Sequence, residues 1–494
     1  MMKLIRIDPS DNVAVALVPV NAGEILDAGG VSVTARDPVS RGHKIALQDI
    51  PAGAPVIKYG CPIALAKQDI PAGSWVHTHN AGTALTENSS CVYHHESSSL
   101  PALPDRTFRG YRRSDGRTGI RNELWILPTV GCVNPVAEEL ARRNQGLVSG
   151  SIDGLYAFTH PYGCSQLGDD LAQTEKLLAA LAHHPNAGGV LILGLGCENL
   201  THDRFVKALG SFDENRIRFL SCQDADNEIE SGSKILQELA AGAGKQHRET
   251  VSASELIVGM KCGGSDGLSG ITANPAVGRF SDLLIALGGS TILTEVPEMF
   301  GAESILFPRC ESEAIFRKAV KMTDDFKQYF TSHGQTVYEN PSPGNKAGGI
   351  TTLEDKSCGC VQKGGSAQIT DVLGYADPVV RKGLNLLSGP GNDLVSATDL
   401  AAAGAQLILF TTGRGTPFGA PVPTVKISTN TALFEKKGSW IDFNAGLIAE
   451  GKETRDAAAM RLLDLTLSVA DGEKTRNEQN GFRGIAIFKD GITL

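Results

Sequence analysis

Apolar residues occur along the chain in short continuous runs, and five of these runs lead into a cysteine. Helix-like segments separate most of the runs. Strands that alternate with helices predict an α/β fold with a parallel sheet. The runs cover residues 124–130, 155–159, 190–195, 217–220 and 256–260, and they lead to Cys132, Cys164, Cys197, Cys222 and Cys262 respectively.

The alternation of strands and helices continues nearly to the end of the chain. Further strands are expected at residues 290–296, 367–372, 384–387 and 406–411, and helices at 135–143, 169–181, 228–240 and 456–470. This number of strands allows either one large sheet or two packed lobes that divide near residue 245. Residues 108–494 are therefore expected to form the α/β region.

Residues 1–80 have a different pattern, in which short alternating apolar runs are separated by Gly, Pro and Asn. The hexapeptide QDIPAG occurs at residues 48–53 and again at 68–73. Each copy predicts a turn that leads into a strand. We therefore expect a small, internally symmetric β domain of the β-clip type. Residues 81–107 are polar and rich in serine, which is typical of a linker.

Composition limits the classes of partner. The chain has 494 residues, of which 41% are hydrophobic and 20% charged, as in globular proteins. A net charge of −9 argues against nucleic acid and anionic membranes as partners. The first residues lack the apolar core of a signal peptide, and ten cysteines are too dispersed for a disulfide framework. We expect a cytoplasmic protein with reduced thiols.

Four of the cysteines lie in turns beside a glycine, after the predicted strands. Ligands of parallel sheets bind beyond the carboxyl ends of the strands, where several thiolates could converge on a soft metal or an iron–sulfur centre. Any single cysteine has the alternative of being an inert buried thiol. The predicted metal ligands are Cys132, Cys164, Cys197 and Cys262.

Three glycine-rich polar loops, at residues 261–267, 340–346 and 411–417, each combine backbone N–H groups with a cation. Such loops can hold carboxylate and hydroxyl oxygens, although each could also be a plain surface turn. The predicted substrate-binding residues in them are Ser265, Asn345, Lys346, Arg414 and Thr416.

Candidates for proton transfer are less specific. His77 and His79 follow the second hexapeptide at a spacing that puts two rings on one face of a strand, and His160 stands four residues before Cys164. Asp266 and Glu198 are the carboxylates of two of the polar turns. The segment 194–199 begins Gly-x-Gly but lacks the third glycine of a dinucleotide site, which argues against NAD.

Several long motifs are specific enough to indicate a family. On these motifs the whole chain resembles the altronate/galactarate dehydratase family. Features of residues 166–170 and 300 are more similar to the altronate branch than to the galactarate branch. The motifs are RNELW at 121–125, YGCSQLGDD at 162–170, GLGCEN at 194–199, KCGGSDGLSGITANP at 261–275, EVPEMF at 295–300, NPSPGNKAGG at 340–349 and GRGTP at 413–417.

The resemblance implies a β-clip domain of the SAF type, a linker and an unusual Rossmann-like parallel sheet with flanking helices. It also implies a homodimer, a requirement for ferrous iron, and dehydration of D-altronate to 2-keto-3-deoxy-D-gluconate. Galactarate or another hexonate is the alternative substrate. A redox protein and a non-catalytic sugar-acid binder remain open as other classes.

Removing the hydrogen beside a carboxylate is difficult, and a Lewis-acid metal can stabilise the resulting enolate while it polarises the leaving hydroxyl. Two forms of iron are compatible with the sequence. One is a mononuclear Fe²⁺ with mixed ligands, and the other is a labile [4Fe–4S] cluster on three cysteines. The cluster is preferred because a ferrous ion alone does not need several thiolates.

Overall fold

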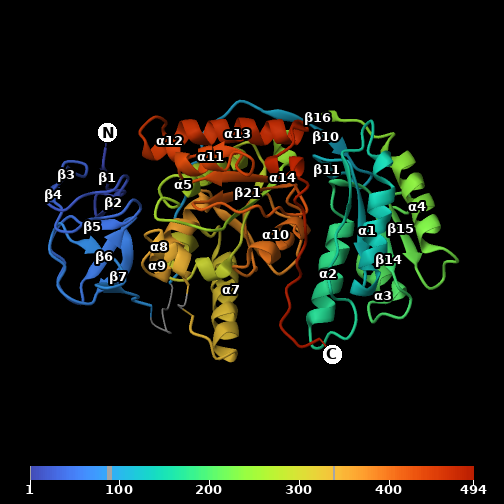
Figure 1. The fold of residues 1–494 in the computed structure, drawn as a ribbon, viewed down its shortest axis with the longest axis horizontal. Coiled ribbons are helices and arrows are strands. Elements are labelled where there is room, and N and C mark those ends of the chain that lie inside the picture. Colours follow the sequence, from blue (N-terminus) through green and yellow to red (C-terminus); the bar gives the residue numbers. More distant parts are fainter. Residues whose placement is uncertain (1, 86–91, 338–339, 494) are drawn as a thin grey trace.

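The computed structural model describes residues 2–85, 92–337 and 340–493. Within these ranges, none of the helices has the length and apolar character needed to cross a bilayer. Figure 1 shows three bodies in a row, with a small β domain at one end, a large α/β body in the middle and a second α/β body at the other end.

The small β domain consists of antiparallel strands. A four-stranded sheet has the order β1-β2-β5-β8, next to a three-stranded sheet β6-β7-β9 and the hairpin β3–β4. The two hexapeptides pair symmetrically, because Asp49 accepts a hydrogen bond from Ala72 N–H and Asp69 accepts one from Ala52 N–H, both 2.8 Å. The strands are β1 (Leu4–Ile5), β2 (Val13–Ala16), β3 (Ile25–Asp27), β4 (Ser32–Thr34), β5 (Lys44–Ala46), β6 (Pro55–Lys58), β7 (Cys61–Ala66), β8 (Trp75–Val76) and β9 (Ala81–Gly82).

The terminal α/β body is built on a parallel four-stranded sheet of order β13-β12-β14-β15. Helices α1 (Asn134–Arg143) and α4 (Glu228–Ala243) pack together, as do α2 (Asp170–Ala182) and α3 (His202–Leu209). The helices cover the apolar strands from which the sheet is made. These strands are β12 (Glu123–Pro128), β13 (Gly154–Ala157), β14 (Ala187–Gly194) and β15 (Ile217–Ser221).

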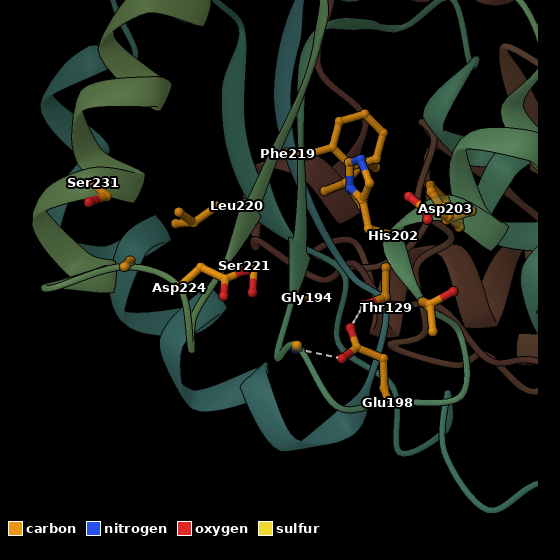
Figure 2. A pocket seen from close by; sticks show the side chains of 15 residues that line it. Thr129, Gly194, Glu198, His202, Asp203, Phe219, Leu220, Ser221, Asp224 and Ser231 are labelled. Carbon is orange, nitrogen blue, oxygen red and sulfur yellow. Dashed lines mark hydrogen bonds between the residues drawn. The ribbon is translucent and has the colours of Figure 1, made fainter.

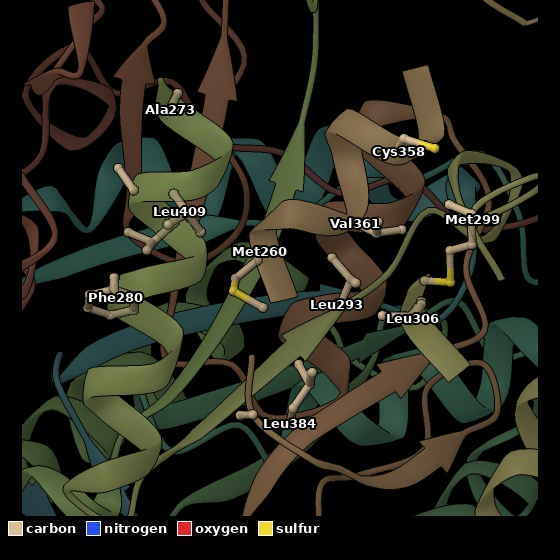
Figure 3. Close-up of a cluster of buried hydrophobic side chains, with 14 of the residues drawn as sticks. Met260, Ala273, Phe280, Leu293, Met299, Leu306, Cys358, Val361, Leu384 and Leu409 are labelled. Atoms are coloured by element: carbon tan, nitrogen blue, oxygen red, sulfur yellow. The ribbon is translucent and has the colours of Figure 1, made fainter. Parts of the chain in front are cut away.

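The central body contains a parallel seven-stranded sheet of order β19-β20-β18-β17-β21-β22-β23. Figure 3 shows part of its core, where Met260, Leu293 and Leu409 from three strands pack near Phe280 of a helix. The strands are β17 (Ile257–Cys262), β18 (Ser290–Leu293), β19 (Ile369–Leu373), β20 (Gly383–Leu387), β21 (Leu407–Thr412), β22 (Thr424–Ser428) and β23 (Phe443–Asn444).

Helices cover both faces of this sheet and its edges (Figure 1). Helix α5 packs on α13, and α10 packs on α2 of the four-stranded body. The helices are α5 (Ala273–Ala286), α6 (Glu303–Leu306), α7 (Glu313–Ser332), α8 (Pro343–Ala347), α9 (Leu353–Cys360), α10 (Asp393–Ala402), α11 (Thr431–Lys436), α12 (Gly446–Ala449), α13 (Arg455–Asp471) and α14 (Arg476–Gln479).

A short antiparallel sheet joins the two α/β bodies. In it β10 (Thr107–Arg112) pairs with β11 (Thr118–Gly119) and with β16 (Glu249–Ser252), which lies between the two parallel sheets in the sequence. The predicted fold class, a small β domain followed by parallel sheets with flanking helices, is confirmed. The boundaries at residues 80, 107 and 245 stay predictions.

Candidate active site

The three glycine-rich loops lie together at the carboxyl edge of the seven-stranded sheet. The loop after β17 is bonded to the loop after β21, where Gly413 N–H donates to the Gly264 carbonyl at 3.1 Å. It is also bonded to α8, where Asn345 Nδ2 donates to the Ser265 carbonyl at 2.8 Å. The convergence expected from the sequence is therefore present for these loops, and it places the predicted substrate-binding residues in one region.

Asn345 and Ser265 are buried, whereas the two predicted cations are more accessible. Lys346 is half-buried on α8, and Arg414 is exposed and donates to the Gly344 carbonyl at 3.1 Å. Thr416 is half-buried beside them. The loops thus bury polar groups and leave two cations accessible, an arrangement suited to an anionic ligand.

Asp266 holds the loop after β17 in place. The carboxylate of this half-buried residue accepts hydrogen bonds from Thr429 Oγ1 at 3.0 Å and from Ser269 Oγ and Leu268 N–H, both at 3.1 Å. Burial raises the pKa of this carboxyl group. Three donors on one carboxylate leave it better suited to fixing the loop than to moving a proton.

The small β domain covers the glycine loops through close backbone contact and buried charges. A Cβ atom on Gly267 would lie 1.9 Å from the Gly42 carbonyl oxygen, so only glycine fits there. Lys44 Nζ and Lys58 Nζ lie 2.8 Å and 3.0 Å from the two oxygens of the Asp355 carboxylate, and all three side chains are buried. The charge of Asp355 therefore connects the β domain to α9.

Burial sets the protonation of this group of charges. It lowers the pKa of Lys44 to about 8 despite the neighbouring carboxylate. Burial alone would raise the pKa of Asp355, but the two ammonium groups hold it well below its usual range. The carboxylate is therefore ionised at neutral pH and compensates two buried cations.

Three histidines gather around Trp75 at the same junction. Trp75 Nε1 donates to His43 Nδ1 at 3.1 Å, which leaves the His43 proton on Nε2, 3.3 Å from the Ala347 carbonyl. His77 and His79 lie in the turn after β8, and their rings are 5.4 Å and 4.9 Å from that of Trp75. His77 is buried with Nδ1 3.3 Å from Thr351 Oγ1, whereas His79 is exposed.

His77 is neutral at physiological pH. Burial, together with the charge of Lys44 and the ring of His43, lowers its pKa to about 4. A neutral imidazole retains a lone pair on one nitrogen, as a general base requires.

Beneath the loops lies a narrow cavity with room for about one water molecule, about 10 Å³. This volume is too small for a six-carbon sugar acid in the arrangement that the structure has. The lining residues include Lys58, Tyr59, Ser265, Asn274, Asp355, Lys356 and Cys360.

A buried group of metal-type ligands borders this cavity. Cys262 Sγ at the end of β17 lies 2.9 Å from Glu298 Oε2 and 3.6 Å from Cys360 Sγ of α9. The donor atoms of the three residues all lie within 4.8 Å of one another. This set of two thiols and a carboxylate is compatible with a bound metal ion.

Buried lysines balance the negative groups around this triad. Lys356 Nζ lies 2.7 Å from the other Glu298 oxygen, Oε1, and Lys261 Nζ lies 3.0 Å from Glu295. Although burial would raise the pKa of Glu298, Lys356 and a second lysine hold it well below the usual range. Glu295 has a φ of +69°, a left-handed conformation that is rare without glycine and concentrates at functional sites.

An altronate dehydratase of Bacillus subtilis (strain 168) is 52% identical to this chain over 498 aligned positions, covering 100% of both proteins. This chain belongs to the altronate/galactarate dehydratase family. An altronate dehydratase of Escherichia coli (strain K12) is also 52% identical, with 100% of both covered. The galactarate dehydratase (L-threo-forming) of the same organism is 33% identical over 98% of this chain and 96% of its own length.

The sequence profiles of the family match the three bodies of the structure. The altronate/galactarate dehydratase SAF domain matches residues 2–84, the D-galactarate dehydratase/altronate hydrolase second domain matches 110–244, and the D-galactarate/altronate dehydratase C-terminal profile matches 253–493. The resemblance stated from the motifs is confirmed.

In this family member the four predicted metal ligands do not lie along one sheet edge, contrary to the expectation. Cys132, Cys164 and Cys197 follow β12, β13 and β14 of the four-stranded sheet, whereas Cys262 ends β17 of the seven-stranded sheet. The runs look alike in sequence because both sheets are parallel and buried, but the chain changes sheets between β15 and β17.

His160 and Glu198 also belong to the four-stranded sheet, away from the glycine loops. His160 is buried, with Nε2 2.7 Å from the Pro128 carbonyl and Nδ1 accepting from Tyr162 N–H at 3.2 Å. Burial lowers its pKa to about 4. With both nitrogens bonded to the backbone, this ring fixes the loop after β13.

Sequence reasoning missed the partners of Cys262. Glu298 lies 36 residues after Cys262, and Lys356 and Cys360 come from α9, nearly 100 residues after it. The close pair Cys358-Gly359-Cys360 was a usable signal. Cys358 packs in the hydrophobic core, as Figure 3 shows, whereas Cys360 joins the triad.

Proposed function

We propose that this protein is a sugar-acid dehydratase that converts D-altronate to 2-keto-3-deoxy-D-gluconate and water. Two full-length relatives at 52% identity are named altronate dehydratases, and the galactarate dehydratase is more distant at 33%. The observation that carries the proposal is the joining of three glycine-rich loops over a buried cluster of lysines, carboxylates and thiols, closed by the β domain.

The reaction removes the C2 proton beside the substrate carboxylate and expels the hydroxyl group on C3. The proton and the hydroxide leave as water, and the resulting enol tautomerises to a 2-keto acid, so no oxidant or reductant is needed. Charge develops on the carboxylate as the proton leaves. Cations and N–H groups placed there lower the barrier, and each such donor contributes on the order of 3 kcal/mol.

The described residues supply these groups. The accessible cations Lys346 and Arg414 are suited to the substrate carboxylate, and Ser265, Asn345 and Thr416 to its positioning. Lys356 lines the cavity and can stabilise the enolate.

For proton transfer we favour His77, because it is neutral at physiological pH and contacts Thr351, which is next in sequence to the cavity-lining residue Ile350. His79 is exposed on the same turn and is the second candidate. Asp266, Glu198 and His160 are hydrogen-bonded within the protein and receive structural roles.

A ferrous ion, which the family resemblance implies, would polarise the leaving hydroxyl and stabilise the enolate. Cys262, Glu298 and Cys360 would hold it, since mixed sulfur and oxygen donors suit a borderline divalent metal. The Lys356 ammonium, which now pairs with Glu298, would have to shift to make room.

The test is production of a keto acid by the protein purified without oxygen and supplied with Fe²⁺. D-Altronate is expected to give 2-keto-3-deoxy-D-gluconate faster than galactarate or other hexonates. The Cys360→Ser variant should lose activity, whereas Cys310→Ser, a buried thiol outside the triad, should retain it. Turnover of galactarate alone would reassign the substrate, and binding of altronate without turnover would indicate a sugar-acid binder.

We also propose that the protein is a homodimer, as the resemblance implies. Analytical ultracentrifugation at micromolar concentration measures its mass directly. A species of single-chain mass would contradict this part of the proposal.

A further inference from the structure

A second group of cysteines lies at the carboxyl edge of the four-stranded sheet. Cys132, Cys164 and Cys197 follow β12, β13 and β14, which are adjacent in the order β13-β12-β14. Cys132 and Cys197 are exposed and Cys164 is half-buried, whereas Cys310 and Cys358 elsewhere are buried. Because free cysteine is among the most buried residue types, two exposed thiols on one rim indicate a function.

Hydrogen bonds join the three loops that carry these thiols. Gly131 N–H, beside Cys132, donates to the Tyr162 carbonyl at 2.8 Å in the loop of Cys164. Ser165 N–H, on the other side of Cys164, donates to Asn199 Oδ1 at 2.8 Å in the loop of Cys197. Since neighbouring strands are about 4.8 Å apart, the three loops that carry the thiols lie side by side at one edge of the sheet.

The loop of Cys197 is fixed by its neighbour Glu198. The Glu198 carboxylate accepts from Thr129 Oγ1 at 2.7 Å, and from the N–H groups of Leu195 at 3.1 Å and Gly196 at 2.6 Å. Figure 2 shows this carboxylate bridging the ends of β12 and β14. A clamp of this kind holds the rim in one geometry before any ligand binds.

The rim also has the form of a ligand site. The strands of this sheet are parallel, but the chain adds β13 on one side of β12 and β14 on the other. Open α/β sheets bind ligands at such a switch point, here between β12 and β14. A hollow of about 700 Å³ opens beside this point, and its lining includes Thr129, Gly196, Glu198 and Ser221 but none of the three cysteines, although Cys197 stands between two of these residues in the sequence. Cys132 stands at the N-terminus of α1, where the helix dipole favours an anionic ligand group.

Glycine at the rim brings the backbones close together. Gly163 has a φ of +101°, and a Cβ atom on it would lie 1.8 Å from the Thr129 carbonyl oxygen. Any larger residue would push the loop of Cys164 away from that of Cys132. The sequence therefore keeps these two thiols near each other by steric means.

We propose that Cys132, Cys164 and Cys197 bind a [4Fe–4S] cluster on this rim, separate from the candidate active site. Three thiolates from three loops match the ligand type that holds iron–sulfur clusters, whereas the buried triad of Cys262 offers mixed donors for a single ion. The β domain and the four-stranded body lie on opposite sides of the central body in Figure 1, so the two metal sites are different sites. The proposal does not depend on the substrate.

Anaerobic reconstitution with an iron salt, sulfide and a thiol reductant tests it. We expect about four irons and four acid-labile sulfides per chain, with visible absorption that bleaches on reduction. Each of Cys132→Ser, Cys164→Ser and Cys197→Ser should lose most of this sulfide. The matched control Cys222→Ser, which alters the cysteine after the neighbouring strand β15, should keep it.

A variant at the other site separates the two hypotheses. Cys262→Ser should keep the labile sulfide and lose keto-acid formation, so failure of one proposal leaves the other measurable. In case a rim variant misfolds, alkylation of the unmodified protein gives a second readout. Reconstitution should protect Cys132, Cys164 and Cys197 from iodoacetamide, as measured by mass spectrometry.

Three outcomes would overturn the cluster. One is bound iron or zinc without labile sulfide. Another is full sulfide content in the triple variant in which Cys132, Cys164 and Cys197 are all replaced by serine. The third is alkylation of the rim cysteines at the same rate before and after reconstitution.

Discussion

Replacement of Asp355 by asparagine should loosen the β domain from the catalytic body. The Asp355 carboxylate is buried between Lys44 Nζ at 2.8 Å and Lys58 Nζ at 3.0 Å, and it also accepts from Thr351 N–H at 2.9 Å. Asp355→Asn keeps the size of the side chain but leaves two buried ammonium groups without a counter-charge.

Removing one partner of a buried ion pair costs about 3–5 kcal/mol. If that cost falls on the contact between the β domain and α9, the docking equilibrium shifts roughly 150-fold to 5,000-fold. The matched control is Asp377→Asn, which breaks the exposed pair with Lys176 at 2.6 Å. Exposed pairs contribute about 0–1 kcal/mol, so the control should change little.

Hydrogen–deuterium exchange measured by mass spectrometry is the assay. Peptides that cover residues 44–58 and 349–356 should exchange faster in Asp355→Asn, whereas peptides of β12 should keep the wild-type rate. Keto-acid formation should fall as well, because the β domain closes the cavity. Exchange at the wild-type rate in both peptides, with the variant folded, would refute the reasoning that this carboxylate fastens the domain.

Three further predictions follow from single contacts. Gly267→Ala should reduce activity and lower the melting temperature, because its Cβ atom would meet the β-domain backbone at 1.9 Å, whereas Gly391→Ala, with no atom within 4 Å, should do neither. Glu478 is buried against two arginines that, against the effect of burial, lower its pKa from 4.5 to about 2. The ionised Glu478 therefore adds about 3 kcal/mol to the free energy of unfolding, in full above about pH 4.5, and this contribution is lost as the pH falls towards 2. In urea unfolding, Glu478→Gln should lack this acid-dependent loss of stability. His77→Gln should lower kcat about 10²–10⁴-fold with little change in KM, while the exposed His94→Gln should match the wild type, and equal kcat in both variants would exclude His77 as the base.

Much of the fold could be predicted because buried parallel strands are continuous apolar runs. The run at 190–195 overlaps β14 (Ala187–Gly194) and extends one residue past its end, and the predicted helix at 228–240 lies within α4 (Glu228–Ala243). Strand pairing could not be predicted in the same way, because it depends on contacts between distant residues. Cys262 was therefore grouped with the cysteines of a sheet to which it does not belong.

The candidate site was predictable only in its loops. Gly-rich turns after strands are visible in the sequence, and their convergence follows from parallel strand direction. The buried charges were not visible. Lys44 and Lys58 read as ordinary strand lysines, and Asp355, their counter-charge, lies 311 and 297 residues away along the chain. Local spacing carries no information about such pairs.

The central claim is that the protein removes water from D-altronate through an enol. The most direct measurement is ¹H NMR of the reaction run in D₂O. The account predicts a 2-keto-3-deoxy-D-gluconate that carries one deuterium on C3, because the enol takes up its new hydrogen from solvent. A product with two protium atoms on C3, one of them moved from C2 within the molecule, would contradict it, and so would the absence of any keto acid from the iron-loaded protein.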